Sequence, residues 1–249
     1  MYINDVHIAF FLGAAILGLF VGQIEDWSIK RMLKKKKVIS RAFFKEYLAD
    51  FKPNYLLMIT TMLVYVGLVY VNKISITIVG NLDLIKFILL TPLLIVALVI
   101  DYKQQIIPNR LNLTMLELGL LFAFLYGLSN IAISINMLLG MVTGAGIFLL
   151  ITVIGGLFYG KEAMGFGDVK LMGVLGLLLG FSNIIVISAM AFLIGAILSI
   201  ILLITKIKKS NEYIPFGPFI VIATFISMYV PFETLKFILM KVFTLGMYR

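Results

Sequence analysis

The sequence predicts an all-α, polytopic membrane protein with about eight transmembrane helices. Of its 249 residues, 62% are hydrophobic, and the mean hydropathy is +1.11, whereas soluble domains are about 45–50% apolar. The apolar residues also fall in runs of roughly 20, which is the length of helix that crosses a bilayer. Because no long polar stretch interrupts them, we expect one integral membrane domain over residues 1–249.

The predicted spans follow the apolar runs in order. The first run, His7 to Gly22, is interpreted as a span and not as a cleavable signal peptide, because no basic region precedes it and no small-residue cleavage site follows. A short basic segment of about 27–53, with Lys34 to Lys37 at its centre, separates the first two spans. Pro108 suits the start of the fourth, where its missing N–H is not needed. The predicted spans are about 6–24, 54–72, 84–100, 111–128, 132–158, 169–181, 184–205 and 217–232, followed by an amphipathic tail to Arg249 that we expect on the membrane surface.

The distribution of lysine and arginine predicts the orientation. Sixteen of the 21 lie in the loops after the first, third, fifth and seventh predicted spans. Because positively charged loops are retained in the cytoplasm, this bias places those loops inside and both termini outside. We therefore expect a multi-pass protein of the cytoplasmic membrane. Its net charge of +9 is interpreted as binding anionic lipid headgroups and not nucleic acid.

Two aspartates fall on the cytoplasmic side of this layout. Asp101 ends the third predicted span, and Asp168 precedes the sixth. The chain has no cysteine and one histidine, His7, which excludes thiolate chemistry and argues against a histidine-based triad. Two neighbouring carboxylates share one proton, because their like charges raise the pKa of one of them. One then takes a proton from water while the other protonates a scissile carbonyl oxygen, which is peptide hydrolysis without a metal.

The segment from Glu162 to Leu171 places two glycines beside Asp168. Gly165 and Gly167 remove side chains just before the acid, which lets the backbone turn and lets another chain approach. The plainer interpretation is a turn between two helices that carries a solvated aspartate. However, an ionised carboxylate in hydrocarbon costs about 3 kcal/mol on insertion scales, so acids in such sequences usually have a function.

Several segments together resemble the type IV prepilin leader peptidases. The strongest resemblance is Met164-Gly-Phe-Gly-Asp-Val-Lys-Leu171, which is similar to the GxGD signature of that family. The early segment matches only weakly, mainly at Gly22, Ile29 and Arg31. The resembling segments follow the family order and cover most of the chain: Gly22–Arg31, Asp101 with Ile107–Asn109, Met164–Leu171, and Ile214–Phe219.

The resemblance implies an aspartic endopeptidase that removes the leader peptide of type IV prepilins or pseudopilins at the cytoplasmic face. It implies Asp101 and Asp168 as the catalytic pair, and as supporting loop residues Glu162, Gly165, Gly167 and Lys170. Proteolysis by this pair needs no cofactor. Many members of the family also methylate the new N-terminus with S-adenosylmethionine. That second activity stays open, and the resemblance identifies no residues of this chain that bind the cofactor.

The chain departs from the family pattern in the basic segment. Many members carry two Cys-x-x-Cys pairs there, interpreted as a zinc site, whereas residues 27–53 contain no cysteine. We therefore expect no zinc. Asp26 also stands where the family usually has asparagine. Both departures affect the expectation of methyltransferase activity more than that of protease activity, because the two aspartates lie elsewhere in the chain.

A proton-coupled membrane transporter is the alternative function, because acids inside a membrane also serve as proton relays. Both aspartates are predicted at span boundaries and not at the midplane, and no matching pair of broken helices is visible, which argues against it. A purely structural subunit leaves the grouping of Gly165, Gly167 and Asp168 without a reason. Glu117 is interpreted either as pairing with a nearby basic residue or as lying near the active site. Glu25 and Asp26 are expected to pair with Lys30 or Arg31 at helical spacing.

Overall fold

The computed structural model describes residues 2–34, 38, 47, 52–75, 77, 79–159, 164–206 and 214–244. Within these ranges the regular structure is helical apart from β1 (Tyr2–Ile3) and β2 (Val6–His7), a short antiparallel pair that precedes the first helix. The prediction of an all-α membrane protein is therefore confirmed. The chain divides into two compact units, residues 1–104 and 105–249. The expectation of one membrane domain over the whole chain stays a prediction.

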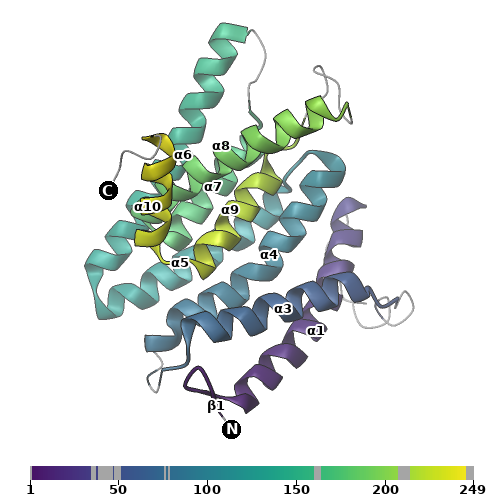
Figure 1. The fold of residues 1–249 in the computed structure, drawn as a ribbon, viewed down its shortest axis with the longest axis vertical. Helices are drawn as coiled ribbons and strands as arrows, with labels where there is room; N and C mark the ends of the chain where they lie inside the picture. Colours follow the sequence, from purple (N-terminus) through teal and green to yellow (C-terminus); the bar gives the residue numbers. More distant parts are fainter. Residues whose placement is uncertain are drawn as a thin grey trace. The chain divides into compact units, whose positions relative to one another are not determined.

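The first unit is built from three long helices: α1 (Ile8–Leu33), α3 (Tyr55–Asn72) and α4 (Leu82–Gln104), with a single turn of 3-10 helix, η1 (Val79–Asn81), before α4. Helices α1 and α3 cross closely (Figure 1), because glycines of α1 face the backbone of α3. A Cβ atom on Gly18 would lie 2.5 Å from the Cα of Met62, and one on Gly22 would lie 2.6 Å from the Cα of Met58. Such small residues allow helix backbones to approach in membranes.

Side chains near the end of α1 bind the chain as it enters α3. The amide of Gln23 donates to the carbonyl of Lys52 at 3.1 Å and accepts from the backbone N–H of Asn54 at 3.1 Å. The side chain of Asn54 donates to Asp26 at 2.8 Å. Asp26 also forms an ion pair with Lys30 one turn further on, as its helical spacing predicts. These contacts fix the start of α3 against α1.

Glu25 has a different environment from its neighbour. Its side chain is only 1% exposed, and one carboxylate oxygen accepts a hydrogen bond of 2.8 Å from the hydroxyl of Thr61 on α3. A second polar contact joins α3 to α4, since the Tyr65 hydroxyl donates to the carbonyl of Ile88 at 2.8 Å. Buried polar groups normally have hydrogen-bond partners, so these contacts help to set the packing of the three helices.

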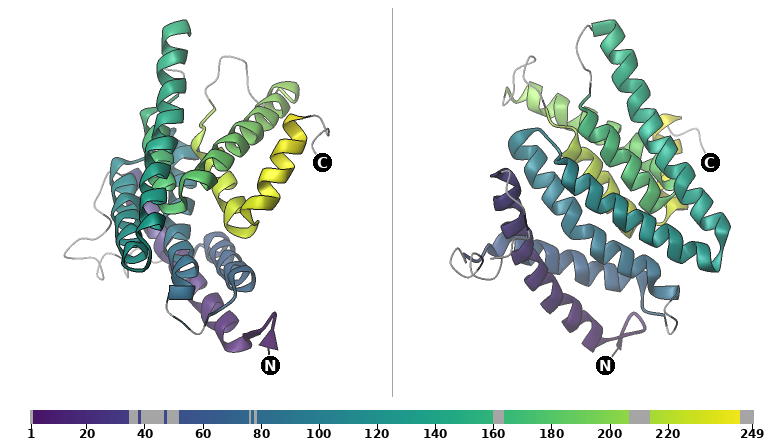
Figure 2. Two further views of the ribbon diagram at one scale, coloured as in Figure 1. Left: turned by 90° about the vertical axis from the view of Figure 1, so that its left-hand side faces the viewer. Right: turned by 180° about the vertical axis from the view of Figure 1, so that it is seen from behind.

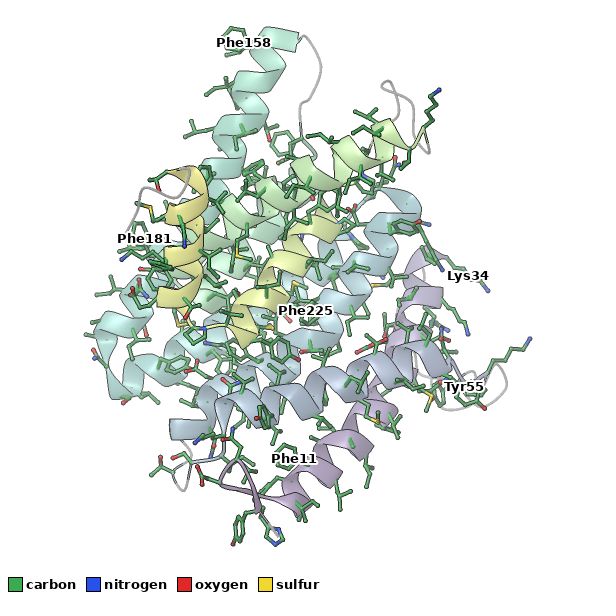
Figure 3. All side chains as sticks on the ribbon, in the orientation of Figure 1. Phe11, Lys34, Tyr55, Phe158, Phe181 and Phe225 are labelled. Carbon is green, nitrogen blue, oxygen red and sulfur yellow. The ribbon has the colours of Figure 1, made fainter. Side chains whose placement is uncertain are left out.

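The second unit contains the remaining helices: α5 (Asn109–Ser129), α6 (Ile131–Tyr159), α7 (Phe166–Leu179), α8 (Phe181–Ile204), α9 (Gly217–Tyr229) and α10 (Phe232–Phe243). Helix α7 is the inner one, in contact with α5, α6, α8 and α9. The far end of α6 extends beyond its neighbours, so that Phe158 is exposed (Figure 3). Helix α10 lies beside α8 (Figure 2), where Leu235 and Leu239 pack near Val186.

Six of the described helices are long and apolar enough to cross a membrane: Ile8–Leu33, Tyr55–Asn72, Leu82–Gln104, Asn109–Ser129, Ile131–Phe158 and Phe181–Ile204. All eight predicted spans are found as helices, but α7 has 14 residues and α9 has 13. A helix of 14 residues rises only about 21 Å, less than the hydrocarbon core of about 30 Å. The apolar run of α7 stops at Gly180, whose φ of +85° turns the chain into α8. The expected number of eight spans is therefore approximate.

Glycines bring α6 and α7 into backbone contact. Gly140 on α6 faces Gly176 on α7, and a Cβ atom on either residue would overlap the carbonyl oxygen of the other. One turn along α6, Gly144 faces the carbonyl oxygen of Met172 in the same way. The pair of helices can pack this closely only without side chains at these positions.

We predict that Gly140→Ala lowers the thermal stability of the purified protein in detergent. The added methyl group meets backbone that cannot rotate away, and overpacking of this kind costs about 1–3 kcal/mol. Gly146→Ala on the same helix is the matched control, because a Cβ atom there meets no atom within 4 Å. The control is expected to be neutral or to stabilise α6 by up to about 1 kcal/mol. Equal losses of stability in both variants would contradict the backbone contact.

Candidate active site

Asp101 lies in the last turn of α4 and is 4% exposed. The helix continues for three residues and ends at Gln104, because Gln105 adopts a positive φ of 56°. A left-handed residue just after a helix is a common way to end it. The carboxyl end of a helix carries partial negative charge, so it disfavours a second negative charge nearby. Asp101 is therefore a buried acid in a position that helix electrostatics alone would not select.

Asp168 lies in the first turn of α7 and is also 4% exposed. Gly165 caps the helix, and its carbonyl accepts the backbone N–H of Asp168 at 3.0 Å. The amino end of a helix carries partial positive charge, which stabilises a carboxylate in its first turn. The two predicted catalytic acids thus lie at helix ends of opposite polarity.

The two loop glycines are not required by their backbone angles. Gly165 has a φ of −69°, which any residue adopts. Gly167 lies inside the first turn of α7, and among the described glycines only Gly180 has a positive φ. The expected freedom to turn is therefore not used in this conformation. What the glycines provide is space beside Asp168.

The start of α5 holds the loop that carries Asp168. Ile107 is buried against Gly167, where an added Cβ atom would lie 3.4 Å from the Ile107 Cβ. The amine of Lys170 donates to the side-chain oxygen of Asn109 at 2.9 Å. The amide of Asn112 donates to the carbonyl of Gly167 through a long hydrogen bond of 3.5 Å. The Ile-Pro-Asn segment and the Gly-x-Gly-Asp segment therefore form one cluster within the second unit.

Asn112 is a site residue that the sequence analysis missed. Its side chain is buried beside Gly167, and its Oδ1 atom accepts no hydrogen bond from the described residues. Buried polar atoms are rarely left in this state, so this oxygen is available to a water molecule or a bound chain. The available signal was its place three residues after Asn109, which puts both side chains on neighbouring positions of one helical face.

The late Ile214–Phe219 segment has a packing role in this structure. Phe216 lies 5.1 Å from Phe192, 5.7 Å from Phe219 and 5.9 Å from Phe148, measured between ring centroids. Aromatic rings at these separations attract one another in tilted or edge-to-face arrangements. This cluster fixes the start of α9 against α6 and α8.

The structure tests the remaining candidates only in part. Gly165, Gly167, Asp168 and Lys170 are found together in the second unit, while Asp101 belongs to the first, so the pairing of the two aspartates stays a prediction. Glu162 and most of the lysine run, Lys35 to Lys37, lie outside the described residues. In the described ranges, no group of three or more histidine, aspartate or glutamate side chains could hold a metal ion. The expectation that no zinc binds also stays a prediction.

Fold and site together define a multi-pass, all-α membrane protein with buried aspartates at two helix ends. The sequence model of the type IV leader peptidase family matches residues 88–200, a segment that includes Asp101 and Asp168. This match confirms the resemblance seen in the sequence: the segment is that of a type IV leader peptidase. The comparisons lend no support to a transporter.

Curated relatives agree with the family match. Proteins named prepilin leader peptidase/N-methyltransferase are 30% identical over 155 residues in Aeromonas hydrophila, 33% over 147 in Legionella pneumophila and 36% over 141 in Pseudomonas aeruginosa. The matched parts cover 62%, 57% and 57% of this chain and 52%, 49% and 48% of the relatives. The chain thus spans about half the length of the curated relatives it matches. No solved structure matches it.

We predict that Ile107→Ala loosens the Asp168 loop. Ile107 is 5% exposed, and truncating a buried isoleucine typically costs about 2–5 kcal/mol. Ile106→Ala is the matched control, because its neighbouring side chain is 65% exposed. Thermal unfolding in detergent measures the difference. If the two variants unfold at the same temperature, the packing of Ile107 against the loop does not stabilise the protein.

Proposed function

We propose that this protein is a membrane aspartic endopeptidase that removes the leader peptide from type IV prepilins or pseudopilins. The observation that carries the proposal is the family match over residues 88–200, because it includes both buried aspartates and the cluster around Gly167. The names of the relatives supply the substrate class, since each is called a prepilin leader peptidase.

The helix ends suggest a role for each aspartate. Asp168, in the first turn of α7, is the ionised carboxylate that takes a proton from the attacking water. Asp101, in the last turn of α4, is the neutral acid that gives its proton to the scissile carbonyl oxygen. Water oxygen bonds to the carbonyl carbon to form a tetrahedral diol. When the diol collapses, the amine leaves with the proton held by Asp168, and a diol hydroxyl returns its proton to Asp101.

The covalent chain supports a meeting of these two acids. Asp101 precedes Ile107 by six residues, and Ile107 contacts Gly167, the neighbour of Asp168. Six residues span at most about 20 Å even when fully extended. The part of this segment up to Gln104 is helical, which shortens its reach further. The Ile-Pro-Asn segment therefore ties the acid of α4 to the loop that carries the acid of α7.

We place the site at the cytoplasmic face of the cytoplasmic membrane. The support is the excess of lysine and arginine in the loops after the first, third, fifth and seventh predicted spans. The basic segment between α1 and α3 is then directed at anionic headgroups of the inner leaflet. A prepilin leader is expected to reach the aspartates from the same side.

N-methylation is a second candidate activity, because the names of the relatives also contain N-methyltransferase. S-adenosylmethionine would then supply the methyl group. The described residues include no side-chain set that we assign to this cofactor, so no step of the proposed hydrolysis involves it. The mass of a prepilin processed in its presence decides the question. A product heavier by one methyl group supports the second activity, and an unmodified N-terminus removes it.

We predict that Asp101→Asn and Asp168→Asn each abolish cleavage and leave membrane insertion intact. An amide can neither take the proton of water nor act as the acid, and loss of one such group costs roughly 10²–10⁴-fold or more in rate. The assay is the mobility shift of a prepilin from the same genome co-expressed with each variant. Asp83→Asn is the control, because Asp83 is an exposed aspartate in the first turn of α4. Full processing by either of the first two variants would exclude the pair as the catalytic dyad.

A further inference from the structure

One face of α5 is exposed along the whole helix. Its exposed positions recur every three or four residues, which places them in a single stripe on the helix. We call this surface the α5 stripe, and it comprises Arg110, Leu113, Thr114, Glu117, Leu120, Leu121, Phe124 and Leu128. The opposite face is buried and contains Met115, Gly119 and Phe122. The stripe is therefore the part of α5 that is free to meet something outside the second unit.

Glu117 makes the α5 stripe unsuited to lipid alone. It lies eight residues after Asn109, about 12 Å along the axis of a helix that is long and apolar enough to span a membrane. No hydrogen bond or ion pair reaches it from the residues that the structure describes. The cation on its own face, Arg110, is seven residues away, beyond the three- or four-residue spacing of helical ion pairs. A carboxylate among Leu113, Leu120 and Leu121 therefore calls for a partner group from another chain.

The α5 stripe begins at the proposed catalytic site. The first turn of α5 binds the Asp168 loop, through Asn109 to Lys170 and through Asn112 to Gly167. Arg110, the first residue of the stripe, belongs to the same turn. A chain whose scissile bond reaches Asp168 and which then enters the bilayer can follow the stripe without leaving α5.

We propose that the α5 stripe is the docking surface for the apolar membrane helix of the substrate, and that Glu117 recognises a basic group on that helix. The apolar side chains match an apolar partner, and the carboxylate matches a positive charge. Continuity with the cluster at Gly167 favours the substrate over a second copy of the chain or a lipid. The inference rests on the proposed function, because it assigns a specificity surface to the same site.

The first test compares two substrates. Glu117→Gln and Glu117→Leu are expected to raise the KM for a full-length prepilin five- to tenfold with little change in kcat. The KM for a soluble peptide that spans the cleavage site but lacks the apolar helix is expected to stay the same. Glu233→Gln is the control, because Glu233 is an exposed acid on α10, outside the stripe. An unchanged KM for the full-length prepilin, or an equal rise for the peptide, would overturn the docking role.

The second test uses the absence of cysteine from the chain. Leu121→Cys on the stripe and Ile200→Cys on α8 are both exposed positions, and only the first belongs to the proposed surface. In the Asp168→Asn background, which retains uncleaved substrate, a prepilin with a cysteine in its apolar helix is expected to form a disulfide with the first variant and not with the second. A disulfide only between two copies of this chain, or equal adducts at both positions, would refute the proposal.

The two inferences fail separately. If the unaltered protein does not process any prepilin from its genome, the proposed function is wrong. If it processes prepilin while Glu117 variants keep the original KM and Leu121→Cys forms no adduct with it, the function stands and the docking surface is wrong.

Discussion

The position of Asp168 depends on the contact between Gly167 and Ile107. The two segments are joined further by the hydrogen bond from Lys170 to Asn109, across 61 residues of sequence. Neither backbone angle nor overlap demands glycine at 167, because alanine would meet Ile107 at 3.4 Å, an ordinary van der Waals distance. Access for another chain is therefore the remaining physical reason for a glycine beside the acid. The same packing that fixes Asp168 keeps one side of it open.

The contact between α6 and α7 supports this arrangement from the other end. Helix α7 is buried from Asp168 to Leu178 with few interruptions, as expected for a helix that is apolar all round. Gly140 and Gly176 let α6 approach its backbone directly, so the axis of α7 cannot shift without a clash. A helix enclosed in this way moves little, and the first turn that carries Asp168 inherits its rigidity. Rigid elements position reacting groups better than loops do.

Hydropathy predicted the helices well because apolar runs bounded by polar turns report burial of any kind. It did not separate burial in lipid from burial in protein, which is why the 14 residues of α7 were expected to be a span. Contacts between distant segments were also beyond it. The hydrogen bond from Thr61 to Glu25 joins residues 36 apart, and the burial of Asn112 beside Gly167 depends on how α5 meets α7. Local spacing carries no information on such pairs.

The short length of α7 bears on how a membrane protease obtains water. With a rise of about 21 Å, the helix cannot cross a hydrocarbon core of about 30 Å, so at least one of its ends lies at membrane depth. Irregular backbone is tolerated there only where protein covers it or where it lines a polar cavity. At one end, Gly180 leads directly into α8. At the other, the Asp168 loop is covered by Ile107 and Asn112, whose side-chain oxygen accepts no hydrogen bond from the described residues. The acid end of α7 is therefore the end that can hold water, and a water bound at Asn112 would lie beside the backbone of Gly167, one residue from the carboxylate proposed to activate it.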